Sequence, residues 1–183
     1  MSGAVSTNLT SQFLVAVPQL VGPFFTKSVV LIIDNSDQGS TGIILNHPMN
    51  NTLSELNESL KSSRRKKDRL FIGGPVAPSA AITLHDDTYQ GLDTKPISGG
   101  VAWSTSLESM QVMAESESLP FRCFLGYAGW TSKQLEAEIA LGSWLLNPMI
   151  PGMIYTDQPK TMWNAVLKEM GLDPLSIGPG AID

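Results

Sequence analysis

The sequence contains very little cysteine and no apolar run long enough to cross a membrane. Cys123 is the only cysteine among 183 residues, which excludes an internal disulfide and a cysteine-rich zinc site. It lies in the apolar segment 121–127, where a buried thiol is the default, so we expect a protein of the reducing cytoplasm. The longest apolar run, 28–33, has the length of a strand and not the about 20 residues of a membrane span. The first residues lack a basic leader and an apolar core, so no signal peptide is expected.

The sequence also lacks an excess of positive charge and an internal repeat. The formal net charge is −5, so the chain as a whole is not expected to bind nucleic acid. No segment recurs with a period of about 20 to 50 residues, which excludes a solenoid. With 42% hydrophobic residues, a chain of this length can bury one core without a metal or a disulfide. We expect a single domain over residues 1–183, with loose termini at 1–11 and 176–183.

The hydrophobic pattern predicts many short strands and few helices. Residues 28–33 are a continuous β-branched run, typical of a strand that is covered on both faces. The turn-rich segment 34–40 separates this run from 41–46 and predicts a hairpin. Further strands are expected at 12–17, 69–72, 80–85, 97–104, 121–127, 143–147 and 152–156. Helices are expected at 52–60, 105–119, 131–142 and 159–171.

This order of elements does not alternate strand and helix as a doubly wound parallel sheet does. Short hairpin links favour a mainly antiparallel or mixed sheet with helices packed outside it, which is the α+β class. The double glycine in 97–104 predicts a bulge or a bend within that strand.

His47 and His85 are the only histidines, and each follows a predicted strand. A cysteine–histidine catalytic pair is not favoured, because Cys123 lies at the centre of a strand and not at a polarising helix start. His85, Asp86 and Asp87 are local candidates for a metal, but a metal site commonly needs three or four ligands that converge. The favoured interpretation of both histidines is a strand-end residue hydrogen-bonded to a turn. We therefore expect no catalytic residue, no metal and no cofactor.

The segment Gly126–Thr131 allows two interpretations. Its glycines and its two large aromatics precede a predicted helix, whose free N–H groups can bind an anion. On this hypothesis the protein is a small anionic-metabolite binder or an enzyme. The alternative is a strand-to-helix corner, in which Trp130 packs on the sheet and Thr131 caps the helix. We favour the corner, because the threonine uses part of the donor set.

A basic run, Arg64–Arg69, is the one positive patch of the sequence. Such a run can neutralise phosphates in a salt-dependent way. No aromatic residues interleave with it to stack bases, and no helix-turn-helix pattern surrounds it. Nucleic-acid contact through this run is an alternative that we do not favour, since such runs are usually solvated linkers.

Six segments resemble the bacterial YqgE/AlgH family and occur in the family's order. They are FLVAVPQL with FFTKSVVLI, GSTGIILNHP, FIGGPV, ITLHDD and FLGYAGWTSKQLEAEIALGSWL, and the resemblance covers residues 11–175. One departure is His47, where family members often carry arginine or lysine before the proline. The resemblance implies a bent, forked sheet that forms a pseudo-barrel with helices outside. It implies little about function, because the family is largely uncharacterised and only sometimes labelled as transcriptional regulators.

We therefore expect a cytoplasmic protein that is not an enzyme. We expect it to act by binding or regulation. Glycine- and proline-bearing loops at strand ends are places where a scaffold presents a site. The candidate binding residues are His47, Gly74, Pro75, His85, Tyr127 and Trp130. The partner can be a protein or a small molecule, and neither it nor the oligomeric state follows from the sequence.

Overall fold

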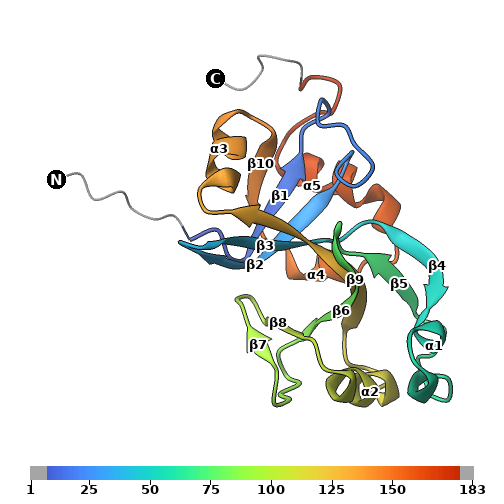
Figure 1. Cartoon of the computed structure of the whole chain (residues 1–183). Helices are drawn as coiled ribbons and strands as arrows, with labels where there is room; N and C mark the ends of the chain where they lie inside the picture. Colours follow the sequence, from blue (N-terminus) through green and yellow to red (C-terminus); the bar gives the residue numbers. More distant parts are fainter. Residues whose placement is uncertain (1–7, 178–183) are drawn as a thin grey trace.

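The computed structural model of the chain describes residues 8–177, which form a curled, mostly antiparallel sheet with helices outside it (Figure 1). The strands are β1 Gln12–Ala16, β2 Val29–Ser36, β3 Gly39–Ile44, β4 Pro48–Thr52, β5 Arg69–Ile72, β6 Val76–Asp86, β7 Lys95–Pro96, β8 Val101–Ser104, β9 Phe121–Thr131 and β10 Trp144–Pro148. The α-helices are α1 Leu53–Leu56, α2 Leu107–Glu115, α3 Gln134–Ala140, α4 Pro151–Ile154 and α5 Met162–Glu169. Two 3-10 turns, Glu58–Leu60 and Pro159–Thr161, precede β5 and α5. The sheet closes into a half-barrel, so the predicted α+β class with a bent, forked sheet is confirmed.

β9 connects the two halves of the sheet. The strand order is β10-β1-β2-β3-β9-β6-β8-β7, and β5 pairs with β9 in parallel while β4 pairs with β5. The second half of β9 pairs with β3, and its first half pairs with β6 and β5. Figure 1 shows β9 running from its place beside β6 and β5, where the sheet forks, to the β1–β3 half.

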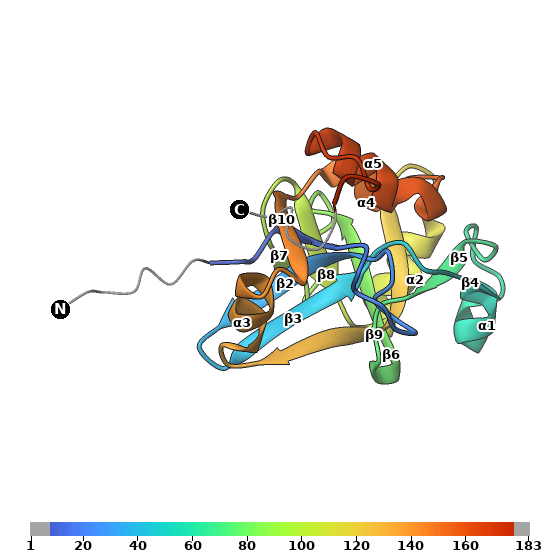
Figure 2. The ribbon, with the colours of Figure 1, turned by 90° about the horizontal axis from the view of Figure 1, so that it is seen from above.

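The strands β1, β2 and β3 bury both of their faces, as the unbroken apolar run at 28–33 predicts. On one face Leu31 and its neighbours pack against α4 and α5, and Figure 2 shows these two helices together on one side of these strands. On the other face Val30 and Ile32 pack against a cluster that includes Leu135 of α3. The predicted hairpin at 28–46 is confirmed as β2 and β3.

A third apolar cluster holds α1 and α2 against the β9 end of the sheet. It contains Leu53, Leu60, Met110, Met113 and Cys123, all of which are buried. The side chains come from both helices, from the 3-10 turn and from β9, so this cluster fixes one wall of the cavity described below.

The carboxylate of Asp93 fastens the loop before β7 to the start of α2. It accepts hydrogen bonds from the backbone N–H groups of Thr105 and Ser106 and from the hydroxyls of Ser106 and Ser109. Burial acts to raise the pKa of Asp93, but these hydrogen bonds outweigh it and hold the pKa well below its usual range. The N-cap of α2 is Ser106, so the helix begins two residues after the start of the range predicted at 105–119.

Two predicted elements differ in the structure. The strand predicted at 152–156 is wrong, because Pro151 occupies the first turn of α4 and fixes a helical backbone there. The helix predicted at 52–60 is interrupted at Asn57, whose side chain accepts from the N–H of Ser59 and begins a separate 3-10 turn.

Residues near both ends of the described chain are packed. Leu9 and Ile177 are buried, and the carbonyl of Ile177 accepts a hydrogen bond from the side chain of Gln19. The other parts of the predicted loose termini, residues 1–7 and 178–183, lie outside the described residues.

Candidate functional site

The GGP and GYAGW segments meet where two backbones cross, at Gly74 and Gly126, and we call this contact the glycine crossing. A Cβ atom on Gly74 would lie 2.1 Å from the carbonyl carbon of Tyr127, and one on Gly126 would lie 2.4 Å from the carbonyl oxygen of Gly74. Both glycines have a positive φ, and Val76 pairs with Tyr127 just beyond the contact. The glycines are therefore explained by the close approach of two strands.

The strand-to-helix corner is not at Gly126–Thr131, so both interpretations of this segment placed the helix start wrongly. β9 continues through Thr131, and α3 begins only at Gln134, after Lys133 in the left-handed conformation. Thr131 does not cap α3, because Lys133 occupies the N-cap position. The backbone N–H of Thr131 instead donates a hydrogen bond to the side-chain oxygen of Gln134 at 3.0 Å. Trp130 is only 7% exposed and packs on the sheet, as the structural interpretation of the aromatics predicts.

Glu138 of α3 holds the two tryptophans that flank this helix. The indole N–H groups of Trp130 and Trp144 both donate to the same carboxylate oxygen at 2.9 Å. Beside them lies a shallow hollow of about 450 Å³, bordered by Tyr127, Trp130 and the polar turn that includes Gln38. Of the predicted candidates, this hollow brings together the two aromatics only.

The remaining predicted candidates lie apart from that hollow. Pro75 is exposed next to the glycine crossing. His85 is fully buried near the opposite end of β6, where its ring nitrogens contact the hydroxyl of Ser104 and the carbonyl of Asp86, each at 2.9 Å. His47 is half-buried before β4, and burial lowers its pKa. Both histidines thus occupy strand-end positions.

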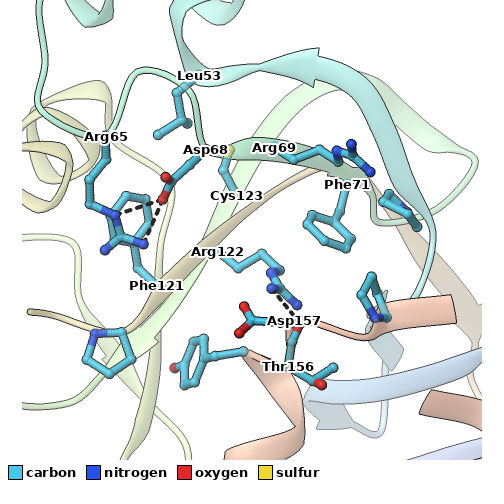
Figure 3. Close-up of a pocket in the computed structure, with 14 residues that line it drawn as sticks. Leu53, Arg65, Asp68, Arg69, Phe71, Phe121, Arg122, Cys123, Thr156 and Asp157 are labelled. Atoms are coloured by element: carbon cyan, nitrogen blue, oxygen red, sulfur yellow. Dashed lines mark hydrogen bonds and ion pairs between the residues drawn. The ribbon is translucent and has the colours of Figure 1, made fainter. Parts of the chain in front are cut away.

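A partly enclosed polar cavity lies elsewhere, between β5, the start of β9 and the segment after α4. It has a volume of about 510 Å³, and we call it the arginine pocket (Figure 3). The residues that define it are Arg65, Asp68, Arg69, Phe71, Phe121, Arg122, Cys123, Tyr155 and Asp157. Part of the basic run therefore lines a pocket, which the interpretation as a solvated linker missed.

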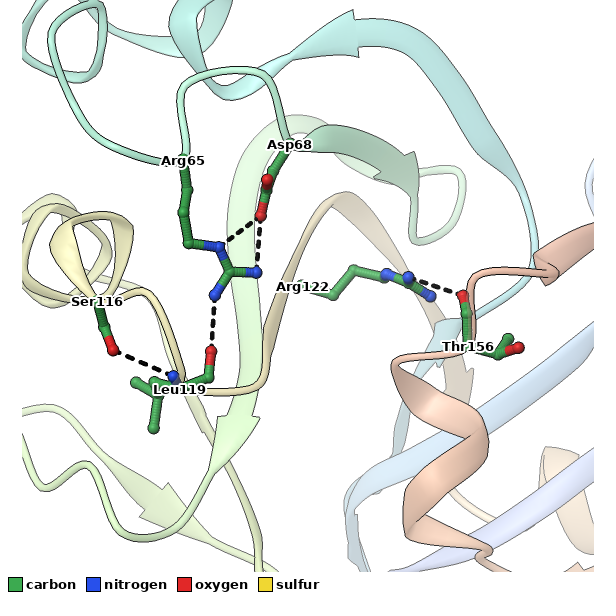
Figure 4. Close-up of polar contacts among 6 residues, drawn as sticks. All are labelled: Arg65, Asp68, Ser116, Leu119, Arg122 and Thr156. Carbon is green, nitrogen blue, oxygen red and sulfur yellow. Dashed lines mark hydrogen bonds and ion pairs between the residues drawn. The ribbon is translucent and has the colours of Figure 1, made fainter.

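Arg122 reaches across the pocket from β9 and is held by backbone carbonyls. Its terminal nitrogens donate to the carbonyl oxygens of Ile154 and Thr156, each at 2.9 Å, and the second of these groups is seen in Figure 4. The guanidinium lies 4.3 Å from the ring centroid of Phe71. Burial lowers the pKa of Arg122 and the nearby Asp157 opposes this effect. Because arginine ordinarily titrates far above neutral pH, the side chain stays charged near neutral pH.

Arg65 lies on the opposite side of the pocket in Figure 3 and is compensated locally. Its guanidinium forms an ion pair with Asp68 at 2.7 Å and donates to the carbonyl of Leu119 at 2.6 Å (Figure 4). It also stacks at 3.9 Å over the ring of Phe121. Arg64, its neighbour in the basic run, forms an ion pair with Glu117 instead.

The hydroxyl of Tyr155 is buried in this region without a hydrogen-bond partner. Among residues 8–177 it is the only fully buried side-chain nitrogen or oxygen that lacks one. Burial raises the pKa of Tyr155, so the phenol keeps its proton and remains a donor. Buried polar groups normally have a partner, so this hydroxyl marks a place where a ligand or a water molecule can supply an acceptor.

Cys123 lines the floor of the pocket but is not a nucleophile in this setting. Burial raises the pKa of its thiol to about 12, so the reactive thiolate is scarce near neutral pH. No group of three or more potential metal ligands occurs within the described residues. The described helices also include none that is long and apolar enough to cross a membrane.

Sequence reasoning missed the arginine pocket because its residues come from four distant segments. Arg65 and Arg69 were noticed as a basic run, but Arg122 lies in an apolar strand and Tyr155 in a segment predicted to be a strand. The alternation of Arg122 with buried neighbours at the start of β9 was the one available signal, since a charged residue inside an apolar strand needs a partner.

Comparisons with known proteins place these features in a family. The sequence model described as AlgH-like matches residues 13–175. The chain is 36% identical over 176 residues to a UPF0301 protein of Myxococcus xanthus, covering 94% of this chain and 97% of that protein. It is 34% identical over 169 residues to a UPF0301 protein of Methylococcus capsulatus, covering 89% and 92%.

Two solved structures share the fold. The solution structure of the AlgH protein from Pseudomonas aeruginosa matches with a TM-score of 0.78 and 28% identity, over 98% of this chain and 99% of that one. A crystal structure of a protein from Corynebacterium diphtheriae matches with a TM-score of 0.73 and 22% identity, over 88% and 86%. The curled sheet is therefore common to proteins whose sequences differ widely.

Proposed function

This chain belongs to the AlgH-like family, and on that premise we propose that it is a binding protein that holds a small molecule in the arginine pocket. The observation that carries the proposal is a cavity of about 510 Å³ whose lining includes a tyrosine with an unpartnered, buried hydroxyl. Ligand sites in proteins usually measure about 300–1,000 Å³ and combine apolar walls with a few polar groups. Three prolines and two phenylalanines among the lining residues supply such walls.

The proposal is binding without covalent catalysis. The pocket thiol, Cys123, is held in its neutral form, and neither histidine lines the pocket. We extend the proposal to a regulatory protein of the cytoplasm, in which the bound molecule changes the affinity for a partner. The label of transcriptional regulator goes further than these residues support.

The hollow beside Tyr127 and Trp130 is the second candidate, because it contains the two aromatics that the sequence singles out. It is bordered by exposed polar residues of the β2–β3 turn, such as Gln38. The free N–H groups of α3 do not add to it, since a helix of this length offers little dipole. A ligand here would be held mainly by Tyr127 and the turn.

A thermal-shift screen against a panel of neutral, anionic and cationic metabolites tests the proposal and assigns the site. We expect at least one ligand to raise the melting temperature by about 5–10 °C at about 100 times its Kd. Two matched variants place an indole on an exposed rim position, Asp157→Trp at the arginine pocket and Gln38→Trp at the hollow. The first should abolish the shift and the second should leave it unchanged.

The opposite pattern, loss in Gln38→Trp alone, would transfer the site to the hollow. No shift with any member of a broad panel would contradict the proposal. Nucleic-acid contact through Arg64–Arg69 is tested separately by a salt titration with DNA, in which we expect weak binding. Arg64 and Arg65 already pair with Glu117 and Asp68, so only part of the run is free to contact phosphates.

A further inference from the structure

We infer that the arginine pocket recognises the phosphate group of a phosphate monoester. This inference rests on the proposed function and names the class of its ligand. The charge of the pocket disfavours a neutral molecule. Its unused donors favour a phosphate over a carboxylate, and its covered aromatic faces disfavour a nucleobase.

The pocket is locally positive in a chain with a net charge of −5. Three arginines line it against two aspartates. The charge of Arg65 is compensated by Asp68, whereas the hydrogen-bond partners of Arg122 are neutral carbonyls. Arg69 forms no ion pair with any described residue. Two guanidinium charges are thus left for an anion, opposed by the exposed carboxylate of Asp157.

The pocket also offers more donors than the protein itself uses. Two N–H groups of Arg122 bond to carbonyls, and the others make no hydrogen bond to a described residue. Tyr155 also lines the pocket, and its hydroxyl is a buried donor with no partner among the described residues. Arginine matches the planar edge of a phosphate or a carboxylate with paired hydrogen bonds. Phosphate has three terminal oxygens and accepts from several directions at once, so it can use a guanidinium on one side and a phenol on another.

The aromatic faces of the pocket are already covered, which disfavours stacking of a nucleobase. Arg122 covers the ring of Phe71, which also packs on Phe124 with ring centroids 5.6 Å apart. Arg65 covers the ring of Phe121. The ligand is therefore held by its anionic group, and the rest of the molecule extends toward the exposed rim at Arg69 and Asp157.

Isothermal titration calorimetry with simple probes tests this inference. We expect glycerol 3-phosphate and inorganic phosphate to bind, and glycerol and succinate to bind at least tenfold more weakly. Tyr155→Phe removes only the unpartnered hydroxyl and should weaken glycerol 3-phosphate about tenfold. Arg69→Gln should weaken it about threefold, whereas Arg64→Gln, a matched change in the same basic run outside the pocket, should leave it unchanged.

The outcomes separate this inference from the proposed function. If a neutral or carboxylate ligand of the panel binds and Asp157→Trp blocks it, while neither phosphate probe binds or competes, the ligand class is wrong and the proposed function stands. If phosphate binds equally well to wild type, Tyr155→Phe and Asp157→Trp, it binds outside the pocket and the inference is overturned. Circular dichroism of each variant establishes that an altered affinity is not caused by unfolding.

Discussion

Replacing Tyr155 by phenylalanine should stabilise the ligand-free protein. A buried hydroxyl without a partner costs about 1–3 kcal/mol of folding free energy, and phenylalanine removes this cost. The small void that the missing oxygen leaves offsets part of the gain, so we expect the free energy of unfolding to rise by about 1 kcal/mol. For a chain of 183 residues this corresponds to an increase in melting temperature of about 2–4 °C.

Tyr89 provides the matched control, because its hydroxyl donates to Ser109 at 3.0 Å. Tyr89→Phe removes a hydrogen bond that is made, so it should lower the free energy of unfolding by about 1 kcal/mol. Urea denaturation of both variants, with the m-value checked for constancy, measures the difference. Destabilisation by Tyr155→Phe equal to that by Tyr89→Phe would refute the reasoning, since it would mean that the hydroxyl of Tyr155 already has a partner in the free protein.

The remaining predictions concern a carboxylate that fastens α2, the acceptor of two tryptophans, the glycine crossing and the buried thiol. Asp93→Asn should lower the free energy of unfolding by about 2 kcal/mol at pH 7. Because the pKa of Asp93 is depressed in the folded state, its contribution to stability is present above about pH 4 and is lost as the pH falls further. Urea titrations should therefore show a smaller difference in stability between wild type and variant at pH 3 than at pH 7. Glu138→Ala leaves two largely buried indole N–H groups without an acceptor, so it should lower the free energy of unfolding by about 2–3 kcal/mol. Denaturation followed by tryptophan fluorescence measures this loss, and a loss near zero would contradict the prediction. Gly74→Ala should prevent folding, judged by circular dichroism, whereas Gly152→Ala, where nothing lies within 4 Å, should fold normally. Cys123 should resist iodoacetamide at pH 8 and react only in denaturant; rapid labelling of the native protein would refute the assignment of a neutral, buried thiol.

The fold could be predicted from the sequence where one local rule dominates. The unbroken apolar run at 28–33 predicted a strand with two covered faces, and its side chains do enter two different clusters. The start and stop of helices were less predictable, because the pairing of strands overrides the capping signals. Thr131 illustrates this, since its pairing with Gly39 keeps it in β9 although the Thr-x-x-Gln pattern favours a helix there.

The candidate site was less predictable than the fold, because its chemistry depends on side chains that meet only in three dimensions. Glycine and aromatic residues drew attention to the glycine crossing, where the structure uses them for packing. Neither Arg122 nor Tyr155 lies in a motif, and the only signal in the sequence is the charge of Arg122 within an apolar strand. A half-buried arginine bonded to carbonyls and a tyrosine hydroxyl without a partner become informative only once burial and hydrogen bonds are known.

The glycine crossing and the arginine pocket are connected through β9. The two contacts occupy the same strand, because Gly126 lies between the residues of β9 that pair with β5 and those that pair with β3, and Arg122 lies in the part that pairs with β6. The crossing brings the end of β5 against β9, and the pairing of Phe71 with Phe124 in β9 then places the ring of Phe71 under the guanidinium of Arg122. The conformation that requires glycine is therefore also the one that builds a wall of the pocket. Glycine at these positions thus supports the proposed site through the backbone, although no glycine needs to contact the ligand.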